Sequence, residues 1–419
     1  MRKRLFTVMI TCMLAAAGCG HMQKDSRQPS AENAADRSVK QAKELTQDIG
    51  IGINIDYSKP SMEPVQKFGY QLLQHNMEEK NPLLSPVSAY VVLCMLGNGA
   101  QGVTKEEIQH VLGGDLMCIP DDLMNTLDTK LSMANSAWMD DQFTAHDEWL
   151  GTIKSLFDAQ VYQADLQAGT TTDDINEWVS GHTNGKIPEL IDQPFDESVV
   201  LVLLNALYLQ ADWEQQFEPE NTFDWDFTSD DGKTKRVPMM HNLIEDCAYI
   251  KDDTAEGVIL PYKDSNLAFV AVKPSGGENV REWYSAYSSK KLQDLIKSRK
   301  NTLVSLGMPK FTVRFRKNLN ESLKSMGIQL AFDPSQADLS LLGASSYGEG
   351  LYLSIVLQET EIETGEKGTK AAAATMAAES GGGMPQDLQE VQLDRSFFYM
   401  IMDMESGAPV FMGILDQPE

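Results

Sequence analysis

Residues 365–385 read GEKGTKAAAATMAAESGGGMP and lie between two segments, 351–362 and 397–402, that have the apolar pattern of β-strands. Alanine makes Thr369–Glu379 a fair helix by local propensity, but the triple glycine and Pro385 would end that helix without an apolar partner. Its apolar side chains are nearly all small, so the segment can bury little surface. A loop of this length between strands is typical of a functional segment or of disorder.

The chain from Pro60 onward shows helical spacing of apolar residues first and strand patterns later. The segments predicted as helices are 68–77, 85–96, 104–112, 121–131, 148–157 and 173–179, and Thr104 with Glu107 has the spacing of a capping box. The segments predicted as strands are 199–209, 236–240, 248–251, 267–272, 303–315, 351–362, 397–402 and 410–414. Helices followed by strands predict an α+β fold, in which helices pack on large, mostly antiparallel sheets.

The first residues have the features of a secretion signal: a basic start, MRKR, then the apolar run LFTVMITCMLAAA, and small residues before Cys19. The run is too short to remain as a membrane span. A cysteine directly after Ala16-Ala17-Gly18 resembles a bacterial lipobox, which predicts removal of residues 1–18 and lipidation of Cys19. The alternative is an ordinary cleaved signal. Residues 19–59 are polar and poor in aromatic side chains, so we interpret them as a flexible tether to a body that spans 60–419.

The net charge of −26 at pH 7 falls on this body, because residues 20–59 hold equal numbers of basic and acidic side chains. An acidic surface repels phosphates and anionic lipids, so we expect no nucleic acid partner and no membrane contact apart from the lipid anchor. Besides Cys19, removal of the signal leaves three internal cysteines, Cys94, Cys118 and Cys247, without the close spacing of a disulfide framework or a zinc site. The histidines show no paired ligand spacing, and no nucleophile elbow or phosphate loop occurs. We therefore expect no metal, no cofactor and no enzyme active site.

Several short motifs of the body occur in one order. They are Ser85-Pro86-Val87-Ser88, then Asn205-Ala206-Leu207-Tyr208 with Trp213 after it, then Leu306-Gly307-Met308-Pro309-Lys310-Phe311, then Glu366-Lys367-Gly368-Thr369 with Ala371–Ala374, and finally Phe397-Phe398 with Pro409–Gly413. With these motifs in this order, the chain resembles the serpin family of protease inhibitors over about residues 62–417. Each motif is weak alone, and together they resemble an inhibitory serpin of the bacterial lipoprotein type.

The resemblance implies a fold with one large, mostly antiparallel sheet, two smaller sheets and an exposed reactive-centre loop at about residues 366–390. It also implies that a serine or papain-like cysteine protease cuts this loop and is trapped as a covalent complex when the loop inserts into the large sheet of a metastable body. The implied hinge, from which insertion starts, consists of Glu366, Gly368, Thr369, Ala371, Ala372, Ala373 and Ala374. The implied breach and shutter, where the sheet opens, include Trp213, Ser85, Ser88, Asn205 and Gln358.

The hinge residues fit what strand insertion requires. Alternation places Thr369 and the odd-numbered residues to Ala377 on one face, and Lys370 with the even-numbered residues on the other. The first face carries no charge, so it can pack on the core while Lys370 meets solvent. Gly368 offers a pivot with a free φ angle, and Thr369 is β-branched and small. We therefore expect Gly368–Ala378 to be the inserting segment, and the surrounding motifs disfavour a loose linker or a marginal helix.

Counting from the two ends of the loop brackets the cleaved bond. The family's usual loop length puts the residue before the cut at Gly382 when counted from Glu366, and at Pro385 when counted back from Phe397. The predicted bait consists of Ser380, Gly381, Gly382, Gly383, Met384 and Pro385. No Lys or Arg lies between Lys370 and Arg395, which disfavours trypsin-like proteases. Small residues favour an elastase-like or subtilisin-like target, with a papain-like cysteine protease as an alternative.

Gln358 stands at the position where many serpins carry a shutter histidine, and we expect its amide to form hydrogen bonds with Asn205 and Ser88. Two other interpretations stay open: a serpin-fold protein that binds a ligand or a host surface without inhibiting, and a loop that is only cut as a substrate. The intact hinge favours inhibition. We expect a monomer that is secreted across the inner membrane and anchored by its lipid at the bacterial cell envelope, on the outer membrane or cell surface.

Overall fold

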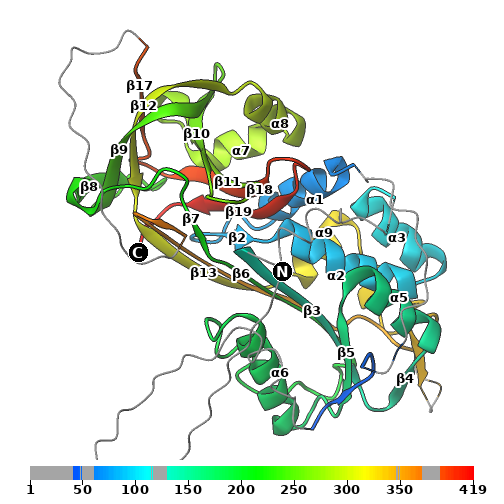
Figure 1. The fold of residues 1–419 in the computed structure, drawn as a ribbon. Coiled ribbons are helices and arrows are strands. Elements are labelled where there is room, and N and C mark those ends of the chain that lie inside the picture. The colour runs from blue at the N-terminus through cyan, green and yellow to red at the C-terminus, as the bar shows by residue number, and fades with distance from the viewer. Residues whose placement is uncertain are drawn as a thin grey trace, which may run out of the picture.

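The computed structural model describes residues 41–47, 49, 61–114, 116, 130–345, 348, 350–369 and 387–419. These residues form two large sheets, one small sheet and eight α-helices. Helices gather mainly in the first half of the chain and strands in the second, and the helices pack on the sheets (Figure 1). The α+β prediction is confirmed.

The first sheet has eight strands among the described residues. In spatial order they are β1 (Lys43–Glu44), β5 (Gln160–Ala164), β3 (Leu131–Asp140), β6 (Leu201–Leu209), β15 (Ile355–Gly365), β16 (Gly368–Thr369) and β7 (Ala211–Asp212), and β13 (Phe311–Asn318) pairs with β15. Every residue of β6 is buried. Such a strand belongs to the interior of a sheet that is covered on both faces.

The second sheet has nine strands among the described residues. In order they are β17 (Gln389–Gln392), β12 (Lys300–Pro309), β9 (Thr234–Lys251), β10 (Ala255–Pro261), β11 (Leu267–Pro274), β18 (Phe397–Asp403), β19 (Pro409–Leu415) and β2 (Leu83–Leu84), and β8 (Thr222–Thr228) pairs with β9. The long strand β9 joins the two smaller sheets that the resemblance implies, because its first part pairs with β8 and its last part with β10. A separate small sheet pairs β4 (Phe143–Ala145) with β14 (Gly343–Ser345).

Two hydrophobic cores lie on opposite faces of the first sheet. The helices are α1 (Glu63–Gln74), α2 (Pro86–Gly99), α3 (Gly102–Leu112), α5 (Asp147–Phe157), α6 (Gly169–His182), α7 (Val280–Ala286), α8 (Ser289–Lys297) and α9 (Asn320–Met326). Leu203 and Leu207 of β6 belong to the core that contains α2, whereas Val202 and Leu204 pack in a second core with Trp178 of α6. Because successive residues of β6 serve different cores, the strand is apolar along its whole length.

Most predicted strands are present with shifted ends. The segment 303–315 is two strands, β12 and β13, on either side of Lys310, and 236–240 and 248–251 are parts of the single strand β9. β3 has no counterpart among the predicted strands, because buried polar residues at 135 and 136 interrupt its apolar pattern. The predicted helix 121–131 lies mostly outside the described residues, and its last residue begins β3.

The capping box predicted from Thr104 and Glu107 is wrong. Helix α3 begins two residues before Thr104, whose hydroxyl accepts a hydrogen bond from the Asp338 amide at 3.0 Å. The Glu107 carboxylate accepts hydrogen bonds from the amides of residues 329 and 330, both at 2.8 Å. Both side chains therefore accept hydrogen bonds from backbone amides of a distant segment. The local sequence pattern could not predict which segment that would be.

Residues 41–47, which fall within the predicted tether, lie against the body. Strand β1 pairs with the edge strand β5, and the Asp174 carboxylate of α6 accepts hydrogen bonds from the amides of Gln41 and Ala42 at 3.0 and 2.8 Å. Lys154 of α5 donates a hydrogen bond to the Thr46 carbonyl. Part of the predicted tether thus belongs to the folded body and covers an otherwise open sheet edge.

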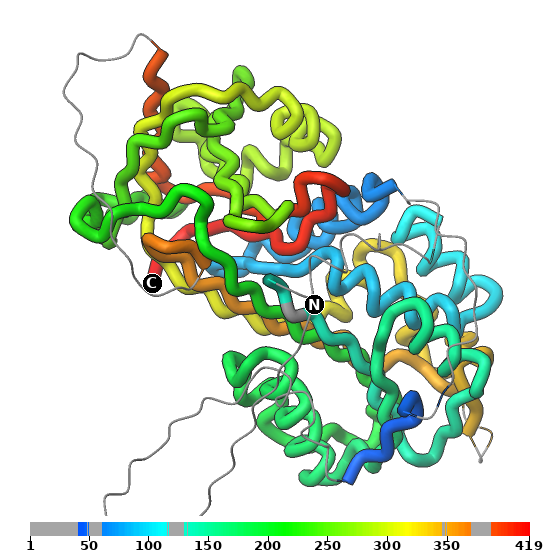
Figure 2. The backbone as a smooth tube through the Cα atoms, in the orientation of Figure 1, coloured from blue at the N-terminus to red at the C-terminus, as the bar shows by residue number. Residues whose placement is uncertain are grey.

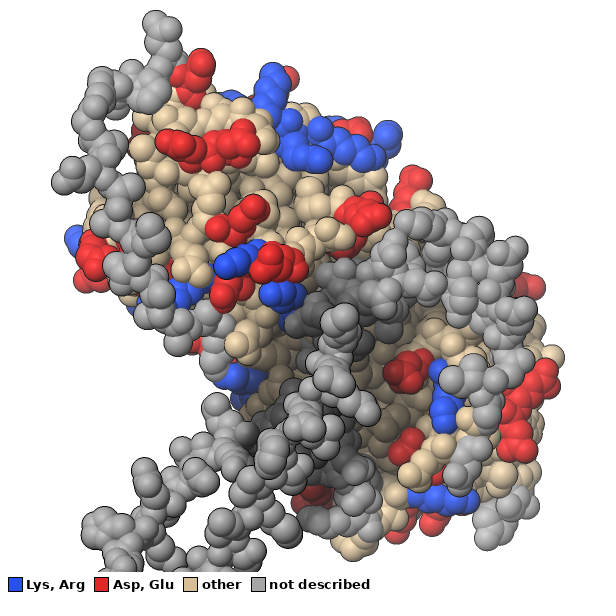
Figure 3. Space-filling model, viewed as in Figure 1, with Lys and Arg blue, Asp and Glu red and all other residues tan. Residues whose placement is uncertain are grey.

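Charged side chains are unevenly distributed on the face shown in Figure 3. Acidic side chains are spread across it, and basic ones gather over α8, which contributes Lys290, Lys291 and Lys297. The strongly acidic composition is therefore visible on this face as well. Within the described ranges, no helix combines the length and the apolar character needed to cross a membrane.

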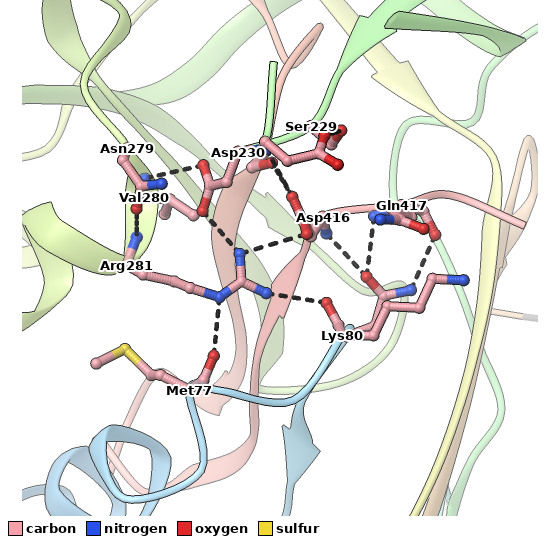
Figure 4. A network of polar contacts seen from close by, with 12 residues as sticks. Met77, Lys80, Ser229, Asp230, Asn279, Val280, Arg281, Asp416 and Gln417 are labelled. Carbon is pink, nitrogen blue, oxygen red and sulfur yellow. Dashed lines mark hydrogen bonds and ion pairs between the residues drawn. The ribbon is translucent and has the colours of Figure 1, made fainter. Parts of the chain in front are cut away.

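Arg281 joins four segments that are distant in sequence (Figure 4). At the start of α7, its guanidinium donates a hydrogen bond to the Asp230 carboxylate at 2.7 Å and lies 3.4 Å from that of Asp416. Its other nitrogens donate to the carbonyls of residues 77, 79 and 80, at 2.8 to 3.0 Å. Asp416 also accepts a hydrogen bond from the Asp230 amide at 2.8 Å. One cation therefore holds the segment that follows α1, the turn between β8 and β9, and the carboxyl-terminal segment together.

We predict that Arg281→Ala destabilises the native protein by about 3 kcal/mol, because two partly buried carboxylates then face each other without a counter-ion. The measurement is the midpoint of thermal or urea unfolding, which should fall clearly. Lys290→Ala is the control, since the Lys290 side chain is 82 % exposed and its pair with Asp294 should contribute almost nothing. Equal midpoints for Arg281→Ala and the wild type would show that the network is dispensable.

Candidate functional site

The start of the predicted hinge forms a short strand inside the first sheet. β16 lies between β15 and β7 and is antiparallel to both, with Thr369 opposite Thr364 on one side and Ala211 on the other. Along its earlier residues, 355–361, β15 pairs directly with β6, and the two strands are parallel. The sheet is therefore open to a third strand at one end and closed along the rest of its length.

The turn between β15 and β16 borders open space. Figure 2 shows the orange end of β15 beside the green segment that carries β7, close to the carboxyl terminus. A cavity of about 720 Å³ lies there, lined by residues 363–368, Lys310, Phe311 and the last two residues of the chain. This side of the turn therefore faces a cavity and not a packed layer of side chains.

Gly368 can be replaced by no other residue without a clash. Its φ of +148° is a value that L-residues rarely adopt. A Cβ atom on Gly368 would lie 2.2 Å from the Ala211 carbonyl oxygen and 2.5 Å from the Asp212 Cα. Both obstacles are backbone atoms of β7, so no side-chain rotation relieves them. The glycine predicted as a pivot is therefore required by the close approach of two strands.

Thr369 is buried and anchored by its hydroxyl. The Thr369 Oγ1 and the Tyr262 hydroxyl form a hydrogen bond of 2.9 Å. Burial raises the pKa of Tyr262, and the hydrogen bond from Thr369 offsets only part of this effect. The Tyr262 ring stacks on Trp213, with ring centroids 4.8 Å apart and planes at 11°. The first inserted side chain thus binds to the aromatic pair beneath the sheet end.

Trp213 and Phe217 hold the hinge turn through its carbonyl groups. The indole nitrogen of Trp213 donates to the Gly365 carbonyl at 2.9 Å, and its backbone amide donates to the Lys367 carbonyl at 2.7 Å. The Phe217 amide donates to the Glu366 carbonyl at 2.7 Å. The carbonyls of residues 365, 366 and 367 are therefore all bound by the segment that carries Trp213 and Phe217.

Glu366 fixes the other side of the turn. Its carboxylate lies 2.9 Å from the Lys310 ammonium and accepts a hydrogen bond from the Thr222 hydroxyl at 3.0 Å. Burial works against ionisation of Glu366, but the contacts with Lys310, its own backbone amide and Thr222 outweigh it, so the pKa of this carboxyl lies below its ordinary value. The hinge turn is consequently tied to β8 and to the residue between β12 and β13.

Gln358 of β15 binds the start of α2. Its side-chain oxygen accepts a hydrogen bond from the Ser85 amide at 2.8 Å, and its side-chain nitrogen donates to the Ser85 carbonyl at 3.0 Å. These two bonds replace the expected ones to Asn205 and Ser88. The amide can face one residue's donor and acceptor at once, which a histidine ring cannot do in the same geometry.

Asn205 uses a different partner although it lies directly beside Gln358 in the sheet. Its amide nitrogen donates to the Asn135 side-chain oxygen of β3 at 2.7 Å. The buried hydroxyls of Ser85 and Ser88 have no hydrogen-bond partner among the described residues. Among the residues predicted for the shutter, only Gln358 and Ser85 therefore bond to each other, whereas Asn205 bonds to Asn135 and no single network forms.

Some predicted site residues lie outside the described part of the chain. These are Ala371, Ala372, Ala373 and Ala374 of the hinge, Ser380, Gly381, Gly382, Gly383, Met384 and Pro385 of the bait, and Cys19 of the predicted lipidation site. The structure describes both ends of the loop. Thr369 lies in the first sheet, and Asp387 precedes β17 at the edge of the second.

Three contributors to the site were not singled out from the sequence: Tyr262, Thr222 and Asn135. Tyr262 reaches Thr369 across 107 positions of chain, and Thr222 reaches Glu366 across 144. No local pattern marks them, because their roles depend on which strands become neighbours. Among the described residues, no group of three His, Cys, Asp or Glu side chains is placed to hold a metal ion.

Comparison with known proteins gives one consistent answer. The sequence model of the family described as serpin (serine protease inhibitor) matches residues 63–418. Neuroserpin from chicken, Gallus gallus, is 30 % identical over 84 % of this chain and 89 % of its own length. The thermophilic serpin tengpin in its native state is 32 % identical and superimposes with a TM-score of 0.81 over 90 % of this chain and 100 % of its own.

The latent state of tengpin, 29 % identical over 88 % of this chain and 100 % of its own, superimposes with a lower TM-score of 0.70. The present fold is thus nearer to the native state of that relative. The fold, the hinge strand between β15 and β7, and the family match over most of the sequence agree, and the chain belongs to the serpin family of protease inhibitors.

Proposed function

We propose that this protein traps a serine or papain-like cysteine protease as a covalent complex by cleavage and insertion of its reactive-centre loop. The observation that carries the proposal is β16, which already occupies the first position of a new strand between β15 and β7. The protease nucleophile attacks a carbonyl carbon of the bait, forms an ester or thioester with it, and releases the amino end of the following residue. The freed loop end then carries the acylated protease along as it inserts.

The register of β16 sets the length of the inserted strand. Thr369 pairs with Thr364, so the same antiparallel register would place Ala378 opposite Ile355, the first residue of β15. The run from Gly368 to Ala378, small apart from Lys370 and Met376, would therefore match the length of β15 beside which it inserts. At about 3.4 Å per residue, this strand would carry its end roughly 35 Å along the sheet.

The two faces of the inserted strand would match those of β15. Odd-numbered loop residues would oppose residues 356, 358, 360 and 362, all buried, whereas Lys370 would oppose Glu363, which is exposed. Directly opposite side chains lie on the same face of a sheet, so the small side chains would enter the core and the opposite charges would pair outside it.

Insertion would replace the one hydrogen-bonded ladder between β6 and β15 with two ladders. Seven parallel residue pairs join β6 and β15, and an inserted strand antiparallel to both would replace them with two antiparallel ladders. Antiparallel pairing is somewhat more stable per residue than parallel pairing, and two ladders hold about twice as many hydrogen bonds as one. This gain is consistent with a native state that is kinetically rather than thermodynamically stable.

The bait composition supports a target with a narrow primary pocket. The sequence from Ser380 to Pro385 offers small residues and one methionine, and Lys and Arg are absent between Lys370 and Arg395. Elastase-like and subtilisin-like serine proteases fit this bait, as does a papain-like enzyme. Pro385 lacks an amide hydrogen and hinders cleavage after Met384, which leaves Gly382 as the first choice for the residue before the cut.

The amino-terminal sequence supports a place at the cell envelope. We propose that Cys19 is lipidated after export across the inner membrane and that the body works as a monomer beyond it, without contact to nucleic acid. The body is acidic, so the lipid rather than the surface would bind the membrane. Residues 41–47 dock on β5, which sets the position on the body from which the anchor extends.

The direct test incubates the purified protein with a pancreatic elastase, a subtilisin and papain. For a serine protease we expect loss of activity together with a protein–protease band that survives boiling in detergent. Mass spectrometry of the released peptide should place the cut within Ser380–Pro385. Clean cleavage without loss of protease activity would contradict trapping and would favour a substrate or a binding protein instead.

A second prediction concerns the first inserted side chain. Thr369→Arg should turn the inhibitor into a substrate, because a buried cation at this position opposes insertion. We expect the number of inhibitor molecules consumed per protease blocked to rise about tenfold, since slow insertion lets the acyl-enzyme hydrolyse first. Thr369→Ser is the matched control, because it keeps the hydroxyl that bonds to Tyr262. If Thr369→Arg inhibits as well as Thr369→Ser, the hinge is wrongly assigned.

The anchor has its own test in the bacterial host. The wild-type chain should partition into the detergent phase of a cloud-point extraction and carry the mass of a diacylglycerol and a fatty acid. Cys19→Ser should move the protein to the aqueous phase. Detergent partitioning of Cys19→Ser equal to that of the wild type would contradict lipidation at this residue.

A further inference from the structure

Large apolar side chains gather on the exposed surface of β8 and β9. Phe223, Trp225 and Leu243 are 47 %, 42 % and 54 % exposed, and they make up three of the five large apolar side chains exposed in the described part of the chain. The Phe223 ring stacks on His241 at 4.2 Å, and Trp225 meets the same imidazole edge-on at 5.6 Å. We call Phe223, Trp225, His241 and Leu243 the aromatic patch.

The side chains of the aromatic patch pack against one another, unlike a set of scattered exposed side chains. Phe223 and Trp225 lie two residues apart on β8, with ring centroids 5.9 Å apart, and both rest on His241 of the neighbouring strand. Leu243 follows His241 by two positions, so it projects from the same face of β9. An exposed and preordered cluster of aromatic side chains is typical of a protein-binding site.

The patch continues to the strand that follows the reactive-centre loop. Across the sheet, His241 lies opposite Gly307 of β12, and Gly307 lies opposite Gln392 of β17. A Cβ atom on Gly307 would lie 1.9 Å from the Gln392 side-chain oxygen and 3.3 Å from the His241 ring. The Gln392 side chain therefore covers Gly307 and extends the surface from β17 to the aromatic patch.

The distance from the bait to this surface is small compared with the size of a protease. The bait, Ser380–Pro385, precedes β17 by four to nine residues, a reach of at most about 14 to 30 Å. β8 is three strands from β17, which is about 14 Å across the sheet. A protease domain of about 230 residues has a radius of gyration of roughly 17 Å and thus a diameter of roughly 45 Å. A protease that holds the bait in its cleft is therefore large enough to reach the patch.

The bait itself supplies little recognition. Three of its six residues are glycines, which offer no side chain to a protease subsite. Selective and fast capture then needs contacts outside the loop, and rigid aromatic side chains provide them at low entropic cost.

We propose that the aromatic patch is a docking surface for the target protease, which seats an apolar surface region beside its active-site cleft on Phe223 and Trp225 while the cleft holds the bait. This inference rests on the proposed function and adds to it a second contact, which governs how fast the protease is captured rather than whether it is trapped.

The test uses the full-length protein and whichever of pancreatic elastase, subtilisin and papain it traps fastest. Phe223→Ser with Trp225→Ser should lower the second-order rate constant of trapping about tenfold, as expected for the loss of aromatic anchors. Leu243→Ser alone should lower it in the same direction, by a smaller factor. The number of inhibitor molecules consumed per protease should stay unchanged, because the replaced side chains form none of the bonds that tie Glu366 of the hinge turn to Thr222 and Lys310.

Val103→Ser with Leu341→Ser is the matched control. These side chains are 58 % and 44 % exposed, and they lie on α3 and just before β14, at the end of the molecule opposite β8 in Figure 1. The control should trap the protease at the wild-type rate, and all variants should unfold at the wild-type temperature, which shows that each is folded.

Equal rates for the wild type and both patch variants would overturn the docking surface and leave the trapping mechanism standing. A wild-type dimer that the double patch variant converts to a monomer, with no change in rate, would assign the patch to a second copy of this chain and would also overturn the proposal. A wild type that traps none of the three proteases would overturn the proposed function and this inference together.

Discussion

Seven parallel residue pairs hold β6 against β15, and this ladder keeps the first sheet closed below the hinge. Slanted parallel pairs bind less strongly per residue than antiparallel ones, so the ladder alone is a weak closure. The stronger resistance comes from the faces of the sheet. β6 places alternate side chains in two cores, one with α2 and one with Trp178 of α6. Separating β6 from β15 therefore disturbs both cores at once, which makes the opening slow even where the open product is more stable.

At the hinge end, the step with the largest entropic cost, the start of a new strand, is already complete. A new strand must bring distant segments together before its hydrogen bonds to the neighbouring strands can form, and closing the loop costs conformational entropy. Here β16 is already paired on both sides, and its turn is held by Trp213, Phe217 and Lys310. Extension of the strand then adds residues to an existing pair. The same contacts also restrain the turn, so in the proposed mechanism the hinge would both begin insertion and slow it.

The residues predicted well from the sequence are those whose chemistry is local. Gly368 and Thr369 were predicted because a strand that enters between two others requires small residues. The apolar run of β6 was predicted because both of its faces are buried. Trp213 came from motif order alone. Tyr262 could not be found this way, because its bond to Thr369 exists only after β10 and its following turn reach the hinge.

Local patterns failed where side chains serve a distant segment. Gln358 was expected to bond within the shutter, yet its amide matches the backbone of Ser85, 273 positions away. Thr104 and Glu107 have the spacing of a helix cap but satisfy amides that belong to residues 329–338. In each case the donor and acceptor types were predictable, and the partner was not, because the partner depends on tertiary register.

Register also divides the reactive-centre loop into two parts with different constraints. A strand in the register of β16 would reach the end of β15 at Ala378, so the residues before that point must fit between two strands, and alanine satisfies this need. The residues after it would remain outside the sheet, and insertion places no limit on their size. In the proposed mechanism, the glycines at 381–383 would therefore be constrained by the fit to the protease cleft and not by the sheet. We expect a bait with so few side chains to bind weakly by itself, which is why we propose that the surface formed by Phe223 and Trp225 contributes to capture.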